Sequence, residues 1–153
     1  MEKFAKSYHL DLSKRITSIN LEEILIEEFG YTIDDKELCK YDNLREIRNI
    51  YIPKNKTLLI DKNISEAQKT FIYAKELAYN YLEIEDRLYT FPWIKFESFD
   101  QVLNNFIASY FAGALIISRK SLIEKLTSFF ELEEWQPLKL HQMNLGEHNS
   151  YSH

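Results

Sequence analysis

The fold is decided by one stretch near the middle of the chain, Phe71-Ile72-Tyr73-Ala74-Lys75-Glu76-Leu77-Ala78-Tyr79-Asn80-Tyr81-Leu82. Apolar residues recur through and just before it at steps of four, three, four and four, namely Ala67, Phe71, Ala74, Ala78 and Leu82. Such steps follow the 3.6-residue period of a helix with one apolar face. Ser65, with Gln68 three residues later, forms a capping box at its start. The stretch therefore predicts an amphipathic helix of about twenty residues.

Three residues in this helix have the spacing of the zinc-binding motif H-E-x-x-H. In that motif two His side chains one turn apart bind zinc, and the Glu between them acts as general base. Lys75 and Tyr79 take the two His positions, and only Glu76 keeps its identity. Because a lysine is a cation at neutral pH and a phenol is a poor zinc ligand, the stretch predicts a peptidase-shaped helix without a metal site.

A second block follows at residues 105–118, and the two blocks resemble the ImmA/IrrE family. Its zincin-like domain occurs alone or behind a DNA-binding helix-turn-helix in bacterial regulators. The family's first block has a pattern like RFTIAHELGHYLL, matched here by Phe71, Ala74, Glu76, Leu77 and Leu82. Its second block reads E-x-x-A-N-x-F-A and then L-L-M-P, against Asn105, Ala108, Ser109, Phe111, Ala112 and Leu115-Ile116-Ile117-Ser118. The family's third metal ligand is the Glu of that block, so the resemblance implies that Asn105 replaces it.

The run from 89 to 100 resembles a narrower subgroup, the XRE-type regulators that carry a degenerate peptidase-like domain. The whole match covers roughly residues 20–130. It implies an α+β fold, in which a helix-rich zincin-like domain has a small sheet of about three strands packed on the degenerate helix. No helix-turn-helix is recognisable in this chain, so the resemblance implies that DNA is contacted through a segment outside it.

Composition bounds the class of protein. The chain has 153 residues, enough for one domain, and its 45% hydrophobic and 14% aromatic content supplies a packed core and excludes disorder. The formal net charge of −5 argues against a domain that binds nucleic acid by itself. We therefore expect any DNA contact to belong to another segment.

Cysteine usage and hydropathy indicate the compartment. Cys39 is the only cysteine, which rules out an internal disulfide and is ordinary for a reducing cytoplasm. Residues 1–15 mix Glu, Lys, His and Asp, unlike a signal peptide. The longest apolar run, residues 111–117, is far shorter than the ~20 residues that span a bilayer. A soluble cytoplasmic protein is expected.

The chain divides into three parts by pattern: residues 1–19 as a lead-in or linker, 20–135 as the degenerate ImmA/IrrE-like domain, and 136–153 as a polar, aperiodic tail. Within the domain, Asn20 and Glu23 are spaced as a capping box for a helix that ends at Gly30. A short strand around residues 31–33 follows.

Two further strands and two further helices complete the prediction. Residues 47–52 and 57–61 are strands joined by a turn at 53–56, which makes a hairpin. Ser98 and Gln101 form another capping box, and the helix that follows is apolar over a wide face. A last amphipathic helix is expected over residues 121–130.

If the helices pack as the resemblance implies, the replaced ligand positions converge in the former active-site groove. The candidate ligand-groove residues are Lys75, Glu76, Tyr79, Asn105, Tyr110 and Trp93. A cation, a carboxylate, a phenol and an amide between aromatic walls suit a small anionic or acyl ligand. The alternative for Glu76 is a structural salt bridge or hydrogen bond. For the aromatic residues between 89 and 99, core packing is the alternative to a groove wall or dimer face. No catalytic residue, metal or cofactor is predicted.

Three functions remain in competition. The first is a non-catalytic regulatory domain of a bacterial transcription regulator, which senses a ligand, dimerises, or both; a homodimer is expected. The second is an active metallopeptidase of the ImmA/IrrE type that cleaves a repressor. The third is a purely structural protein-interaction module. A preserved scaffold with replaced ligand positions favours the first.

Overall fold

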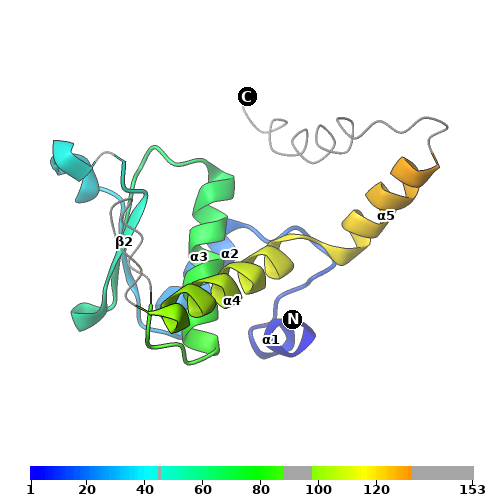
Figure 1. The fold of residues 1–153 in the computed structure, drawn as a ribbon, viewed down its shortest axis with the longest axis horizontal. Helices are drawn as coiled ribbons and strands as arrows, with labels where there is room; N and C mark the ends of the chain where they lie inside the picture. The colour runs from blue at the N-terminus through cyan, green and yellow to red at the C-terminus, as the bar shows by residue number, and fades with distance from the viewer. Residues whose placement is uncertain (45, 88–97, 132–153) are drawn as a thin grey trace. The chain divides into compact units, whose positions relative to one another are not determined.

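The computed structural model describes residues 1–44, 46–87 and 98–131, and it divides the chain into two units, residues 1–116 and 117–153. The first unit contains, in chain order, α1 (Glu2–Ser7), α2 (Ser18–Glu27), β1 (Thr32–Asp34), β2 (Asn49–Ile52), β3 (Thr57–Ile60), α3 (Glu66–Tyr81) and α4 (Phe99–Ile116). The second contains α5 (Arg119–Phe130). Single turns of 3₁₀ helix lie at Leu38–Lys40, Asp42–Leu44 and Pro53–Asn55. The predicted α+β class is confirmed (Figure 1).

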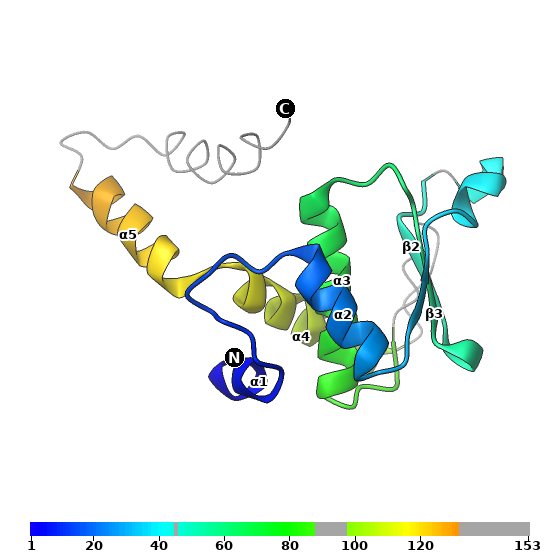
Figure 2. The same cartoon turned by 180° about the vertical axis from the view of Figure 1, so that it is seen from behind.

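The sheet has three strands in the order β1-β3-β2. β1 runs parallel to β3 and β2 antiparallel to it, so the predicted hairpin is confirmed. Pro53 opens the connecting turn, and Lys56 closes it with a φ of +49°. Leu58 and Ile60 alternate with less buried neighbours and join the same hydrophobic core as α2, α3 and α4, which lie on one side of the sheet (Figure 2).

α2 begins earlier than the sequence indicates. Thr17, not Asn20, is the N-cap: its hydroxyl accepts a hydrogen bond from the Asn20 amide, while the Asn20 side chain accepts from the Thr17 amide. The predicted box at Asn20 and Glu23 is therefore wrong, because an Asn side chain can also close a box from its third position. The end is as predicted: Gly30 has a φ of +70°, and its amide donates to the Ile26 carbonyl at 3.2 Å.

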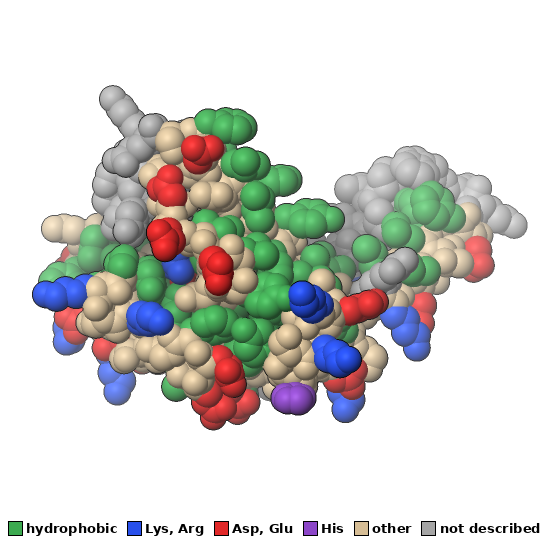
Figure 3. All heavy atoms as spheres, turned by 90° about the horizontal axis from the view of Figure 1, so that it is seen from below, with side chains coloured by type: hydrophobic (Ala, Val, Ile, Leu, Met, Phe, Trp, Pro, Cys, Tyr) green, Lys and Arg blue, Asp and Glu red, His purple; other side chains and the backbone are tan. Residues whose placement is uncertain are grey.

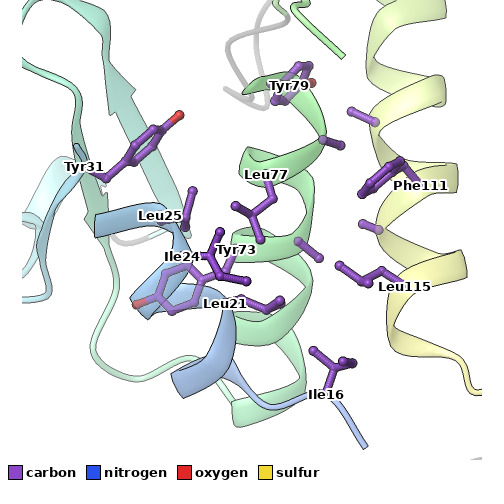
Figure 4. Packing of buried hydrophobic residues seen from close by; sticks show 14 of the residues in the cluster. Ile16, Leu21, Ile24, Leu25, Tyr31, Tyr73, Leu77, Tyr79, Phe111 and Leu115 are labelled. Carbon is purple, nitrogen blue, oxygen red and sulfur yellow. The ribbon is translucent and has the colours of Figure 1, made fainter. Parts of the chain in front are cut away.

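α3 is the central helix, with α2 packed on one side and α4 on the other (Figure 4). Its predicted capping box at Ser65 and Gln68 is confirmed. The predicted apolar stripe is only partly buried, since Phe71 and Leu82 are exposed. Tyr73 and Leu77, outside that stripe, are fully buried because α3 is covered on two sides.

Small residues set the approach of α3 to α4. Ala74 and Ala78 of α3 and Ala108 and Ala112 of α4 have no exposed surface, which lets the two backbones come close. At the start of α4, the Ser98 hydroxyl accepts from the Gln101 amide at 3.2 Å, in agreement with the predicted cap. α4 therefore holds Asn105 over the second half of α3.

The lead-in contributes to the core. Phe4 of α1 is buried, and its ring lies 4.8 to 5.1 Å from those of Tyr8, Tyr81 and Phe111. Ile16 joins the same cluster. The use of residues 1–19 as a connection to another domain stays a prediction, and the predicted tail at 136–153 lies outside the described residues.

The second unit holds α5, which begins at Arg119, two residues before the predicted start. The Ser118 hydroxyl caps it by accepting from the Ser121 amide at 3.4 Å. Across the described ranges, no single helix has both the length and the apolar character needed to cross a membrane. The helical segments Phe99–Ile116 and Lys120–Phe130 meet the length and composition criteria only when they are taken together as a bent pair.

Candidate functional site

Glu76 lies buried in the second half of α3 and has two charged or polar partners from other segments. Its Oε2 accepts a hydrogen bond from the Tyr31 hydroxyl at 2.9 Å and from Arg87 Nη1 at 2.6 Å. Tyr31 directly precedes β1, and Arg87 lies in the segment that follows α3. The Arg87 and Glu76 side chains are both largely buried, so their ion pair is screened little by solvent.

Asn80, one turn after Glu76, completes the hydrogen bonding. Its Nδ2 donates to the Tyr31 hydroxyl oxygen at 2.7 Å and to the Glu76 carbonyl at 2.8 Å. The Tyr31 hydroxyl therefore donates to a carboxylate and accepts from an amide, and Arg87 Nη2 lies 3.4 Å from the same oxygen. A phenol hydroxyl that both donates and accepts a hydrogen bond can be buried without an unsatisfied polar atom.

Two aromatic rings hold the Arg87 guanidinium. Its central carbon lies 4.2 Å from the centroid of the Tyr51 ring and 4.5 Å from that of Tyr79. Tyr51 also stacks on Tyr31 at 5.3 Å. Guanidinium groups bind favourably over aromatic faces, more strongly when water is excluded. We call these six residues the Glu76 cluster: Tyr31, Tyr51, Glu76, Tyr79, Asn80 and Arg87.

The cluster keeps the phenols of Tyr31 and Tyr79 neutral and its guanidinium charged. Burial, reinforced by the Glu76 carboxylate, raises the pKa of Tyr31, and the same two causes raise the pKa of Tyr79 to about 12. Burial alone would lower the pKa of Arg87, but Glu76 and Tyr31 outweigh it, and the pKa is raised. Arg87 therefore stays protonated beside Glu76.

Some of the other predicted groove residues lie near the Glu76 cluster. The Tyr79 hydroxyl lies 3.4 Å from Asn105 Oδ1, a long contact for two oxygens, so the predicted approach of these two positions occurs. Lys75 is half-buried one turn before Tyr79, and burial lowers its pKa although Glu76 opposes the change. Among the described residues, no carboxylate lies within ion-pair distance of Lys75 Nζ.

One of the predicted residues, Tyr110, does not join them. Tyr110 is exposed and stacks on Phe106 at 6.4 Å, on the side of α4 that faces away from α3. Trp93 lies outside the described residues. Sequence reasoning missed Tyr31, Tyr51, Asn80 and Arg87. A buried glutamate in a helix requires a hydrogen-bond donor. Arg87 is the first arginine after α3, and this position was the signal from which it could have been predicted as the partner of Glu76.

The arrangement restricts what Glu76 can do. A general base in a zinc peptidase needs a free carboxylate oxygen beside a metal-bound water. Glu76 Oε2 already accepts two hydrogen bonds. In residues 1–44, 46–87 and 98–131, no three His, Cys, Asp or Glu side chains lie close enough together to hold a metal ion. Glu76 and Arg87 form a largely buried ion pair at 2.6 Å.

A pocket of about 500 Å³ lies elsewhere, beside the 3₁₀ turns and the start of β2. Leu38, Ile47 and the exposed Cys39 line it, together with the Arg48–Asp61 pair at 3.8 Å. No residue of the Glu76 cluster contributes to it. It is therefore separate from the predicted groove.

Comparison with known proteins gives one line of evidence. No family model matches the chain, and no curated protein matches it. Among solved structures it is similar to a Mycobacterium tuberculosis transcriptional regulator, with a TM-score of 0.56 and 19% sequence identity over 92% of this chain. The chain spans 40% of the length of that regulator. What the two share is the fold: this chain resembles, in its architecture, part of a bacterial transcriptional regulator.

Proposed function

We propose that this chain is a non-catalytic regulatory domain of a bacterial transcription regulator, built on a metallopeptidase-like scaffold. DNA would be contacted through a helix-turn-helix segment outside the chain, in keeping with the net charge of −5. One observation carries the proposal: the carboxylate of Glu76, the residue kept from the zinc motif, is held by Arg87 and Tyr31. The fold shared with a transcriptional regulator supports the regulatory part.

The pairing supports a loss of catalysis for an energetic reason. To serve as a general base through Oε2, Glu76 would have to release Arg87 and leave a guanidinium in the interior without its anion. Breaking one side of such a buried pair costs about 3–5 kcal/mol. The cluster therefore favours an arrangement in which Glu76 stabilises the fold, and it disfavours the metallopeptidase alternative.

Metal binding tests the non-catalytic part. Untagged protein is incubated with excess Zn²⁺, passed through a desalting column and analysed for zinc by mass spectrometry. We expect far less than one zinc per chain, and no cleavage of a casein or peptide-library substrate. Stoichiometric zinc together with cleavage that Glu76→Gln abolishes would overturn the proposal and establish the metallopeptidase alternative.

Transcript profiling tests the regulatory part. A strain lacking the gene is compared with the parent and with a strain that carries the gene at a second locus. We expect a small set of transcripts to change and complementation to restore them. Chromatin immunoprecipitation of the full gene product should find the affected promoters. Unchanged transcripts under several growth conditions would contradict a regulatory role and leave the structural interaction module.

A sensed ligand is the second candidate, and Lys75 favours it. Lys75 is half-buried one turn before Tyr79, whose hydroxyl lies 3.4 Å from Asn105 Oδ1. The proposed ligand is a small anion or an acyl compound, which would shift the population between two domain arrangements. Thermal-shift assays with short organic acids and acyl-CoA compounds should show stabilisation of about 2.7 kcal/mol at one hundred times the Kd, absent in Lys75→Met. No shift with any compound would count against sensing.

A further inference from the structure

α4 carries large apolar side chains on the side that faces away from α3. Phe99, Phe106 and Tyr110 are 77%, 65% and 72% exposed. We call the whole set the α4 stripe; in chain order it comprises Phe99, Leu103, Phe106, Ile107, Tyr110 and Ala114, all exposed. Steps of four, three, one, three and four place these residues on one helical face. Figure 3 shows exposed hydrophobic side chains gathered on one face of the molecule.

The inner side of α4 is equally apolar. Ala108, Phe111, Ala112 and Leu115 are buried against the rest of the first unit. Of the 18 residues in the helix, Asp100 is the only one with a charge. A helix with apolar side chains on two opposite faces is normally covered on both of them. Depletion of charge and enrichment of aromatic residues are the composition of homodimer interfaces.

The area of the α4 stripe fits that of half a protein interface. From the exposed fractions and side-chain areas of 150–250 Å² for aromatic residues, the stripe offers about 500 Å² of apolar surface per copy. A standard interface buries roughly 800 Å² on each partner. The stripe would therefore supply most of the apolar centre of such an interface, with polar residues at its rim.

Two copies of the α4 stripe that run in opposite directions place large side chains of one copy opposite smaller ones of the other. If two copies of α4 cross antiparallel about a twofold axis between positions 106 and 107, residue pairs whose numbers have the same sum face each other. Phe99 then lies opposite Ala114, Leu103 opposite Tyr110, and Phe106 opposite Ile107. The bulky end of one helix meets the small end of the other, and every pair is exposed in the single chain. An isologous contact has this pairing by symmetry.

We propose that the α4 stripe is a homodimer interface, in which a second copy of this chain packs its own α4 antiparallel across it. This deepens the proposed regulatory function by naming its partner surface. Its test measures self-association alone, so a monomer would overturn the interface and leave the non-catalytic assignment standing. Stoichiometric bound zinc with cleavage activity would overturn the non-catalytic assignment and leave the proposed interface standing.

Sedimentation velocity of the full chain is the first experiment, across about 1–100 μM, the range of moderate affinities. We expect the wild-type chain to be a dimer in this range, and Phe106→Asp and Tyr110→Asp to weaken association by at least about 100-fold. Ile19→Asp is the matched control, because Ile19 of α2 is 65% exposed, the same fraction as Phe106. Circular dichroism melting checks that all variants fold.

Cross-linking then tests the register. In a Cys39→Ser background, Leu103→Cys with Tyr110→Cys should form an intermolecular disulfide under mild oxidation, because the two positions oppose each other. Leu103→Cys with Ala114→Cys, whose positions do not, is the control and should cross-link far less. A monomeric wild type overturns the proposal, whether the stripe is then free or covered by another segment of the same chain. So does a dimer that Phe106→Asp and Ile19→Asp weaken equally.

Discussion

The Glu76 cluster and the α4 stripe place their side chains in opposite environments. In the cluster, a carboxylate, a guanidinium and two phenol hydroxyls are buried, and each finds a partner within the chain. In the stripe, phenylalanine and tyrosine rings are exposed, and Phe106 stacks on Tyr110. The difference teaches that this scaffold buries its paired polar and charged groups in the Glu76 cluster and leaves large apolar side chains exposed on α4.

The largest expected effect comes from breaking the ion pair. Arg87→Met leaves Glu76 buried without its cation, so the free energy of unfolding should fall by about 3–5 kcal/mol in urea titrations. Arg48→Met is the control: Arg48 is mostly exposed and lies 3.8 Å from Asp61, so its loss should cost less than about 1 kcal/mol. Equal losses in the two variants would show that the cluster is not the stabilising region we describe.

The second largest expected effect is a loss of stability of the Glu76 cluster at alkaline pH. Tyr79 has its pKa raised from 10.0 to about 12, so the folded chain keeps a proton that the unfolded chain loses. The contribution of the Tyr79 phenol to the free energy of unfolding is complete below pH 10. As the pH rises from 10 towards 12, the free energy of unfolding should fall by about 2–3 kcal/mol. Unfolding by urea from pH 8 to 11.5 measures this slope.

Phenylalanine variants assign the slope to residues. Tyr79→Phe should flatten the loss of stability above pH 10, and Tyr31→Phe should do the same, since the pKa of Tyr31 is also raised by burial and by Glu76. Tyr110→Phe removes an exposed hydroxyl of the α4 stripe and serves as control. A slope that Tyr79→Phe and Tyr31→Phe leave unchanged would contradict the burial of these phenols in the cluster.

The smallest effect distinguishes the two glycines among the described residues. Gly113 lies in α4, and a Cβ added there meets no atom within 4 Å, so Gly113→Ala should stabilise the chain by about 0.5–1 kcal/mol. Gly30 has a φ of +70°, where an alanine is strained, so Gly30→Ala should destabilise by about 1 kcal/mol. Thermal melting of both variants shows whether each substitution raises or lowers the stability of the chain. If Gly113→Ala destabilised the chain, a neighbouring group would have to lie close to Gly113 on that side of α4.

Local patterns predicted the elements of this fold well. The Ser65 capping box and the two strand-like runs have short-range signals, and the structure contains both features. The start of α2 was misplaced because Thr17 and Asn20 both carry capping side chains, and the sequence does not tell which one takes the cap. The buried side of α3 was misassigned because a second covering helix adds residues that a single stripe omits.

The candidate site was harder to predict, because its contacts are remote in sequence. Glu76 was identified from its motif, and Tyr79 does approach Asn105. The partners of Glu76 come from 45 residues before and 11 residues after it, where no periodic pattern links them to the helix. Lys75, Glu76, Tyr79 and Asn105 as binders of a ligand stay a prediction.

One consequence of the Arg87–Glu76 pair concerns the supply of ions. A zinc protein depends on the free metal concentration around it, and a chelator weakens it by mass action. Here the positive charge beside Glu76 is carried by the polypeptide and cannot be removed by dilution or dialysis. Stability of this chain should therefore be the same in EDTA as in Zn²⁺, which would let it keep its shape when a cell is starved of metal.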